Sequence, residues 1–279
     1  MEELKAKRDD ETTLIIFAAQ VGHVGVIRQL LDKNANNING ANQHGWTALL
    51  VASQGGHVET VRVLLEKNAD VNKAKEDGTT ALLLAAQKGH VEVVRLLLER
   101  NPDINATNKH GSTALLVASQ GGHVETVRVL LEKNADVSKA KEDGETALLL
   151  ASQPGHVEIV RLLLDKNANN INEAGLHGWT PLLVASYGGH VETVRALLEK
   201  NADINQAKTD GETALLVAAQ NGHDEVVRLL KKAINRKTAT ISLGLGLFRP
   251  GTLLSTLNND SRQIIARLIY NPNSRYGLH

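Results

Sequence analysis

The chain has 279 residues, and its 31 lysine and arginine residues balance 31 aspartate and glutamate residues. Because nucleic-acid-binding proteins usually carry a basic excess that neutralises phosphates, this balance argues against a nucleic-acid partner. The sequence contains no cysteine, which excludes disulfide bonds and thiolate metal sites and fits a reducing compartment.

The two ends of the chain lack the patterns typical of export or membrane insertion. Residues 1–5 are charged and do not form the apolar core of a signal peptide. The apolar stretch at 241–248 is far too short to cross a bilayer, which takes about 20 residues. We therefore expect a cytoplasmic, intracellular protein that does not bind membranes.

A repeated unit follows the charged segment 1–11, which we expect to form a polar N-terminal cap. The tripeptide Gly-x-Thr recurs at intervals of 33 or 34 residues, and an earlier copy lacks only the glycine. A fixed period of this length predicts an array of stacked structural repeats. The copies begin near residues 12, 45, 78, 111, 144, 178 and 211.

The copy at 45–77 shows the local structure that we expect in every unit. Small and apolar residues at 48–52 predict a first helix packed on both sides, which the left-handed conformation available to Gly55 and Gly56 ends. Apolar residues recur at helical spacing over 58–67 and predict a second helix with one buried face. Asparagine, which tolerates a left-handed cap, follows this helix at Asn34, Asn68, Asn101, Asn134, Asn167 and Asn201.

The unit resembles the ankyrin repeat. Gly-x-Thr-x-Leu, Gly-His-x-Glu-x-Val and Asn-Ala-Asp-Val-Asn stand in register over residues 10–235. One departure is Thr-Ala-Leu-Leu where the family usually has Thr-Pro-Leu-His, and Pro181 alone keeps the proline, at a first helical turn. The resemblance implies an all-α solenoid of stacked helix–turn–helix units with protruding loops or β-hairpin fingers, formed by residues 1–235.

The segment after the array has a different composition. We expect a linker at 236–250 and, at 251–279, a degenerate helical C-terminal cap followed by a tail. The cap prediction rests on residues 253–269, which align with the helix pair at 215–231. A cap would cover the apolar surface that the last repeat exposes. The alternative is a tail that does not pack on the array.

Histidines of the Gly-His pairs recur in every unit and could suggest a ladder of metal sites. Equivalent atoms in stacked repeats lie roughly 8–10 Å apart, whereas zinc holds its ligands at about 2 Å. We therefore assign these histidines a structural role and expect neither a metal nor a cofactor. They are His23, His57, His90, His123, His156, His190 and His223.

The residue types of a catalytic triad also occur close together in one unit, as Ser53, His57 and Glu59. Nucleophilic catalysis requires such groups to meet in one cleft. The same three residue types recur at positions 119, 123 and 125. Because a set copied in tandem is typical of a scaffold, we expect no catalytic residue and no enzyme.

The resemblance implies that a partner protein binds the concave face, through the fingertips and the exposed ends of the first helices. Tryptophan and tyrosine are enriched among residues that dominate interfaces, so we expect Trp179 and Tyr187 to anchor the partner, with Leu176 beside them and Trp46 as a second anchor. The alternative is that both tryptophans fold back onto a neighbouring finger. The other predicted contact residues are His44, Gln54, Gln87, Lys88, His110, Gln120 and His177.

The sequence therefore favours a protein–protein interaction scaffold or adaptor that acts as a monomer. A second interpretation is a designed or consensus-like array without a natural partner, because residues 47–71 and 113–137 are identical. A third is a microbial effector that is delivered into a host cell and acts on host proteins, with residues 236–279 as a targeting tail.

Overall fold

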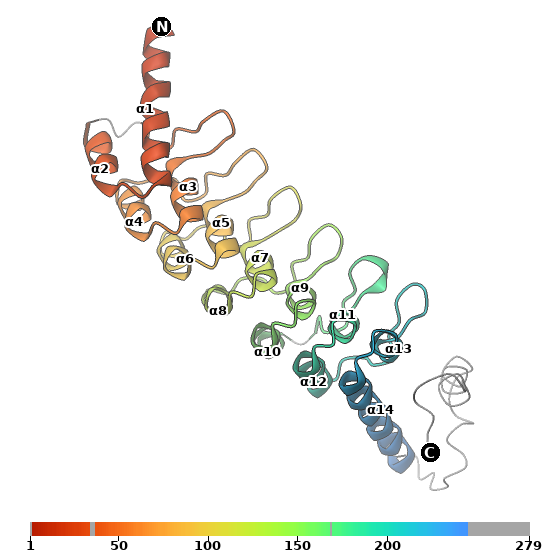
Figure 1. The fold of residues 1–279 in the computed structure, drawn as a ribbon. Helices are drawn as coiled ribbons and strands as arrows, with labels where there is room; N and C mark the ends of the chain where they lie inside the picture. The colour runs from red at the N-terminus through yellow and green to blue at the C-terminus, as the bar shows by residue number, and fades with distance from the viewer. Residues whose placement is uncertain (1, 34–36, 168, 245–279) are drawn as a thin grey trace. The chain divides into compact units, whose positions relative to one another are not determined.

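The computed structural model describes residues 2–33, 37–167 and 169–244, and side chains from residue 11 to residue 237 within these ranges (Figure 1). The chain divides into two compact units, Met1–Lys231 and Lys232–His279, and the repeats lie in the first. Within the described residues this unit is built from helix pairs joined by loops, as expected.

Each repeat contributes an inner and an outer helix, and neighbouring helices of each kind pack side by side in a row (Figure 1). The inner helices are α1 (Glu2–Gln20), α3 (Ala48–Gly55), α5 (Ala81–Lys88), α7 (Ala114–Gln120), α9 (Ala147–Ser152), α11 (Pro181–Tyr187) and α13 (Ala214–Gln220). The outer helices are α2 (Val24–Lys33), α4 (Val58–Glu66), α6 (Val91–Leu98), α8 (Val124–Glu132), α10 (Val157–Lys166), α12 (Val191–Glu199) and α14 (Asp224–Gly244).

The inner helices α3, α5, α7, α9 and α11 form because a threonine caps a short apolar run. The Thr113 hydroxyl, for example, accepts the backbone N–H of Leu116 at 3.3 Å and so pairs one of the free donors of the first turn. Leu115 and Leu116 are both buried, since α7 contacts α5 on one side and α9 on the other. Each buried leucine contributes about 1.5–3 kcal/mol relative to an exposed one.

A histidine joins each of several repeats to the repeat before it. His57 Nε2 lies 2.8 Å from the carbonyl oxygen of Gln20. A carbonyl can only accept, so this nitrogen carries the proton and donates. His90, His123, His190 and His223 make the same bond at 2.8–3.0 Å, whereas His156 does not. These four histidines and His57 therefore have the structural role that the sequence predicts.

Glycine is required where this histidine meets the preceding repeat. Gly89 ends α5 with φ 71°, a left-handed conformation that side chains other than glycine and asparagine rarely adopt. A Cβ on Gly89 would also lie 2.4 Å from Nδ1 of His123. The backbone conformation and the close approach thus exclude a side chain for two separate reasons.

The asparagines after the outer helices follow the prediction with one exception. Asn68, Asn101, Asn134 and Asn201 have φ between 50° and 65°. Asn167 is extended instead, with φ −160°, so the left-handed prediction is wrong there. The repeat that contains Asn167 is one residue longer than its neighbours, and the extra residue lets the chain leave α10 by another path. Asn34 lies outside the described residues.

The loops between repeats are fingers with little β structure. We number them 1 to 6 by their left-handed glycines, which are Gly45, Gly78, Gly111, Gly144, Gly178 and Gly211. Isolated antiparallel bridges join Ala41 to Thr47, Ala140 to Thr146 and Ala207 to Thr213. The described residues contain no β-strand, so fingers 1, 4 and 6 are turns closed by single bridges rather than full hairpins.

Both ends of the array differ from the prediction. The charged residues that were expected to cap the N-terminus continue α1 as one helix, and Leu14 and Phe17 on this helix remain exposed, as does Val21 directly after it. The linker expected at 236–250 does not begin at 236, because α14 continues without a break to Gly244. The cap predicted within 251–279 lies outside the described residues.

Replacement of His123 by alanine tests the contact between repeats. It removes the bond to the Gln87 carbonyl, which is exposed and can bind water instead, so we expect the local free energy of unfolding to fall by about 0.5–1.5 kcal/mol. Amide hydrogen exchange in α7 and α8 measures this loss, since arrays unfold locally. His23→Ala is the matched control, because no described helix pair precedes His23. An equal loss in both variants would contradict the coupling.

Replacement of Thr126 by valine tests the packing of the outer helices. The Thr126 hydroxyl is buried and lacks a hydrogen-bond partner, while Val93 occupies the equivalent position one repeat earlier. Since an unpaired buried hydroxyl is unfavourable, we expect Thr126→Val to raise the free energy of unfolding by about 1 kcal/mol. Urea unfolding followed by circular dichroism measures the change, and a loss of stability would refute the expectation.

Candidate functional site

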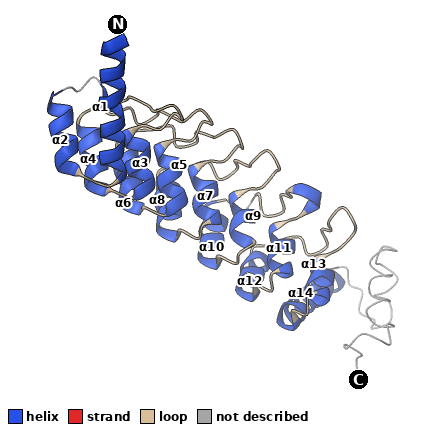
Figure 2. Cartoon of the chain, turned by 45° about the horizontal axis from the view of Figure 1, so that its top comes forward, coloured by secondary structure: helices blue, strands red, loops and turns tan. Residues whose placement is uncertain are grey.

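The fingers project from the same side of the array and stand next to the inner helices (Figure 2). We call the surface formed by the fingers and the inner helices the inner face. Every predicted contact residue lies on it. The fingertip histidines His44, His110 and His177 are exposed, as are Gln87, Lys88 and Gln120 at the ends of inner helices, whereas Gln54 is half-buried.

The two tryptophans are half-buried rather than fully exposed, because a lysine of the next finger covers one ring face of each. Lys75 Nζ lies 4.7 Å from the ring centre of Trp46, and Lys208 Nζ lies 4.6 Å from that of Trp179. A cation over an aromatic ring contributes about 0.5–1 kcal/mol at such partly exposed sites. Both rings therefore pack against a neighbouring finger, as the alternative from the sequence describes.

Carboxylates hold Lys208 over the ring. Its Nζ donates to Glu212 at 2.6 Å and to Asp210 at 2.9 Å. The bond to Glu212 is the main reason why the pKa of Lys208 is raised, and the same lysine lowers the pKa of Glu212 and of Asp210. All three groups thus remain charged together, which keeps the ammonium group in place.

The equivalent lysine of finger 2 is held in a similar way. Lys75 Nζ donates to Asp77 at 3.1 Å, and the backbone N–H of Thr79 donates to the same carboxylate at 2.9 Å. Partial burial raises the pKa of Asp77, but these hydrogen bonds from Thr79 and Lys75 outweigh it and lower the pKa to about 2.

Finger 5 lacks the side-chain acceptor that asparagine provides in fingers 1 and 3. In finger 1 the Asn42 side chain accepts the N–H groups of His44 and Trp46, at 3.0 and 3.1 Å. Gly175 occupies the equivalent position of finger 5 and lacks that acceptor. The tip instead forms one 3-10 turn at Leu176–Gly178, in which His177 has φ 58°.

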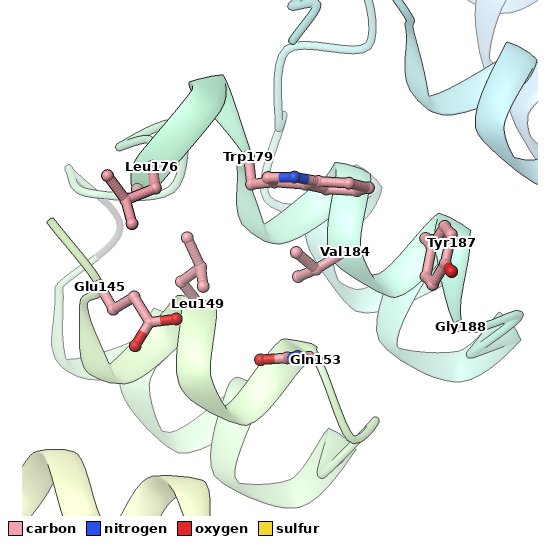
Figure 3. A pocket seen from close by; sticks show the side chains of 9 residues that line it. Glu145, Leu149, Gln153, Leu176, Trp179, Val184, Tyr187 and Gly188 are labelled. Carbon is pink, nitrogen blue, oxygen red and sulfur yellow. The ribbon is translucent and has the colours of Figure 1, made fainter. Parts of the chain in front are cut away.

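This altered finger borders a hollow of about 510 Å³ between α9 and α11 (Figure 3). Trp179 and Tyr187 meet edge to face, with ring centres 5.6 Å apart and planes at 80°. Such pairs contribute about 0.5–1.5 kcal/mol beyond the area they bury. The hollow is lined by Glu145, Leu149, Gln153, Gly175, Leu176, Trp179, Val184, Tyr187 and Gly188.

The structure therefore brings together three of the predicted contact residues, Leu176, Trp179 and Tyr187, and leaves the others spread along the inner face. Sequence reasoning missed Gly175 and Leu149. Gly175 could have been found in the sequence, because the other fingers have asparagine or lysine at this position. Leu149, by contrast, looks like any other core leucine of the array.

Two other hollows on the inner face have a different chemistry. One of about 570 Å³ occupies the equivalent place in the first pair of repeats, and another of about 390 Å³ lies between fingers 3 and 4. Polar and charged side chains predominate in both, including Asn42, Gln43 and His44 in the first and Lys141 and Glu142 in the second. The apolar lining of the hollow beside Trp179 is thus a departure from its neighbours.

The serine, histidine and glutamate that recur in tandem do not form a catalytic arrangement. The Ser53 hydroxyl is buried without a hydrogen-bond partner, and Nε2 of His57 bonds to the Gln20 carbonyl. Among the described residues, no group of three or more His, Cys, Asp or Glu side chains could hold a metal ion. None of the described helices is both long and apolar enough to span a bilayer.

Comparison with known proteins identifies the repeat. A model of ankyrin repeats in three copies matches residues 2–75, 71–141, 136–208 and 171–241. Ankyrin repeats are generally protein-binding scaffolds and are usually non-catalytic. No curated protein matches the sequence significantly.

Replacement of Lys208 by asparagine, the residue of fingers 1 and 3 at this position, tests the charge cluster over Trp179. Without the ammonium group we expect the pKa of Glu212 to rise toward its ordinary value. In the wild type, the stability that this lowered pKa contributes is lost as the pH falls from the ordinary pKa of the carboxyl through its folded pKa, so the variant should lack this part of the acid-induced loss. Carbon-13 NMR titration of the Glu212 carboxyl measures the shift. Lys75→Asn is the control and should leave Glu212 unchanged.

Proposed function

The chain belongs to the ankyrin-repeat family, and from this premise we propose that it is a protein–protein interaction scaffold or adaptor whose inner face binds a partner protein. One observation carries the proposal. Outside the first repeat, the large apolar side chains that are strongly exposed among the described residues are Leu176 and Tyr187, at 58% and 54%. Both line the hollow of the inner face, and exposed apolar groups gathered in one place are typical of interaction sites.

The outer face has a different character. Arginines of the outer helices pair with glutamates of their own and neighbouring helices, as Arg128 does with Glu125 and Glu158 at 3.3 and 3.2 Å. These pairs are exposed and contribute little to stability. Apart from Val26 in the first repeat, the described outer helices carry no strongly exposed large apolar side chain, which favours the inner face as the binding surface.

The fingers are held in place without a partner. The backbone N–H of Lys109 donates to the Asp77 carbonyl at 2.8 Å, which joins fingers 3 and 2. The N–H of Thr209 donates to the His177 carbonyl at 3.0 Å, which joins fingers 6 and 5. Preformed loops lose less conformational entropy on binding, so this arrangement supports recognition by the fingers.

A consensus-like array without a natural partner fits the chain less well. The near-identical copies favour that interpretation, but an array selected for stability alone has no reason to replace the turn-forming asparagine by Gly175 or to expose Leu176. These departures affect one finger and one hollow. They support a site that recognises a partner.

Affinity capture from cell extract, quantified by mass spectrometry, tests the proposed function. The inner-face variant carries Trp46→Ser, Trp179→Ser and Tyr187→Gln, which are residue types found at the equivalent positions of other repeats. We expect it to lose about tenfold or more of the proteins that the wild type captures, because interface aromatics dominate binding. The control variant carries Arg62→Ala, Arg128→Ala and Arg195→Ala on the outer face and should capture them normally. Equal capture by all three proteins, at equal helicity, would contradict the proposal.

A further inference from the structure

The lining of the hollow beside Trp179 indicates what kind of side chain it can accept. Leu149 and Val184 form apolar walls, and Leu176, Trp179 and Tyr187 stand around them (Figure 3). The volume of about 510 Å³ lies within the range of about 300–1,000 Å³ typical of ligand pockets. An apolar side chain of a partner, together with the backbone on either side of it, fits this space and chemistry.

The fingers on either side of finger 5 carry negative charge. Finger 4 presents Glu142, Asp143 and Glu145 against a single base, and Lys141 donates to Glu145 at 2.8 Å. Its ammonium group is therefore engaged within its own finger. Glu142 is exposed at the tip and takes part in no ion pair among the described residues.

Finger 6 repeats this arrangement on the other side. Its Asp210 and Glu212 both bind Lys208, so two carboxylates face one ammonium group there as well. Finger 5, between them, contributes no charged side chain at its tip from Gly175 to Trp179, apart from the titratable His177. A cationic group next to the apolar side chain would thus meet an excess of carboxylates, whereas an anionic group would be repelled.

We propose that the hollow binds a segment of a partner protein in which one large apolar side chain is flanked by lysine or arginine. The apolar side chain enters between Leu176, Trp179 and Tyr187, and the flanking cations lie toward fingers 4 and 6. This inference rests on the proposed function and adds the chemistry of the partner to it. The polar hollow in the first pair of repeats, which has Gln43 and Asn42 in the places of Leu176 and Gly175, lacks these features.

Gly175 keeps the hollow open. A Cβ at this position would lie 3.3 Å from Cδ1 of Leu149 and 3.6 Å from Cγ of Glu145. Gly175→Asn restores the turn residue of fingers 1 and 3 and places a polar side chain against the apolar wall. The variant therefore closes the site with a residue that the repeat already accepts, so loss of binding would not arise from loss of the fold.

A phage library of randomised 12-residue peptides, selected on the full chain, tests the proposal. We expect enriched peptides to carry a leucine-, methionine- or phenylalanine-sized residue within two positions of lysine or arginine. Fluorescence anisotropy with the synthetic peptides should show an affinity loss of about tenfold or more for Gly175→Asn and for Tyr187→Gln. Glu142→Lys should weaken binding by about threefold or more at low salt and less at high salt, because exposed charges are screened. Arg128→Ala, which changes the outer face and leaves the hollow intact, is the control and should bind normally.

The other outcomes separate the inference from the proposed function. Enriched peptides that are acidic, or that lack an apolar residue, would overturn the inference, as would a library with no enrichment. A third outcome is that peptides bind Gly175→Asn as well as the wild type but do not bind variants substituted at Gln54 and Gln87. That result would overturn the inference about the hollow and would leave the inner face as the binding surface. Peptides retained by every inner-face variant would contradict both.

Discussion

The contact between a Gly-His histidine and the repeat before it sets the spacing on which the rest of the array depends. The histidine donates to a backbone carbonyl and its ring fills the place that a side chain on the preceding glycine would take, as His123 does beside Gly89. Because the backbone of this glycine also has a left-handed conformation, the next repeat can approach closely only where glycine occupies the position. The apolar inner helices then meet closely, and each leucine such as Leu115 is buried by neighbouring repeats as well as by its own.

The same spacing makes each finger part of the environment of the next. Lys208 reaches back over Trp179 while its own finger supplies the carboxylates that keep it charged, and Lys75 lies over Trp46 at a similar distance. Backbone bonds between the tips add to this, as from Thr209 to His177. The inner face is therefore ordered by contacts within the protein, which reduces the entropy that a partner must offset on binding.

The hollow arises because finger 5 gives up a local interaction that finger 1 keeps. Gly175 removes the acceptor that Asn42 provides, and the tip forms a 3-10 turn instead. The change leaves Leu176 exposed beside Trp179 and Tyr187 without any gain for the fold. Recognition sites typically contain residues that depart from the local sequence pattern without stabilising the fold.

Repetition made the helix pairs predictable, because the capping threonines, the left-handed glycines and the apolar spacing act within a single unit and recur in every copy. The prediction of Leu176, Trp179 and Tyr187 as a distinct group followed from the same comparison of copies, since they interrupt the pattern. The comparison of copies did not predict the extended conformation of Asn167, where one residue is inserted. Nor did it predict that α14 continues to Gly244, because no repeated signal marks the longer helix. Nor could it place Leu149 and Glu145 beside Leu176, or Lys208 over Trp179. Those residues lie about one repeat apart in the chain, and only the stacking of neighbouring units brings their side chains together.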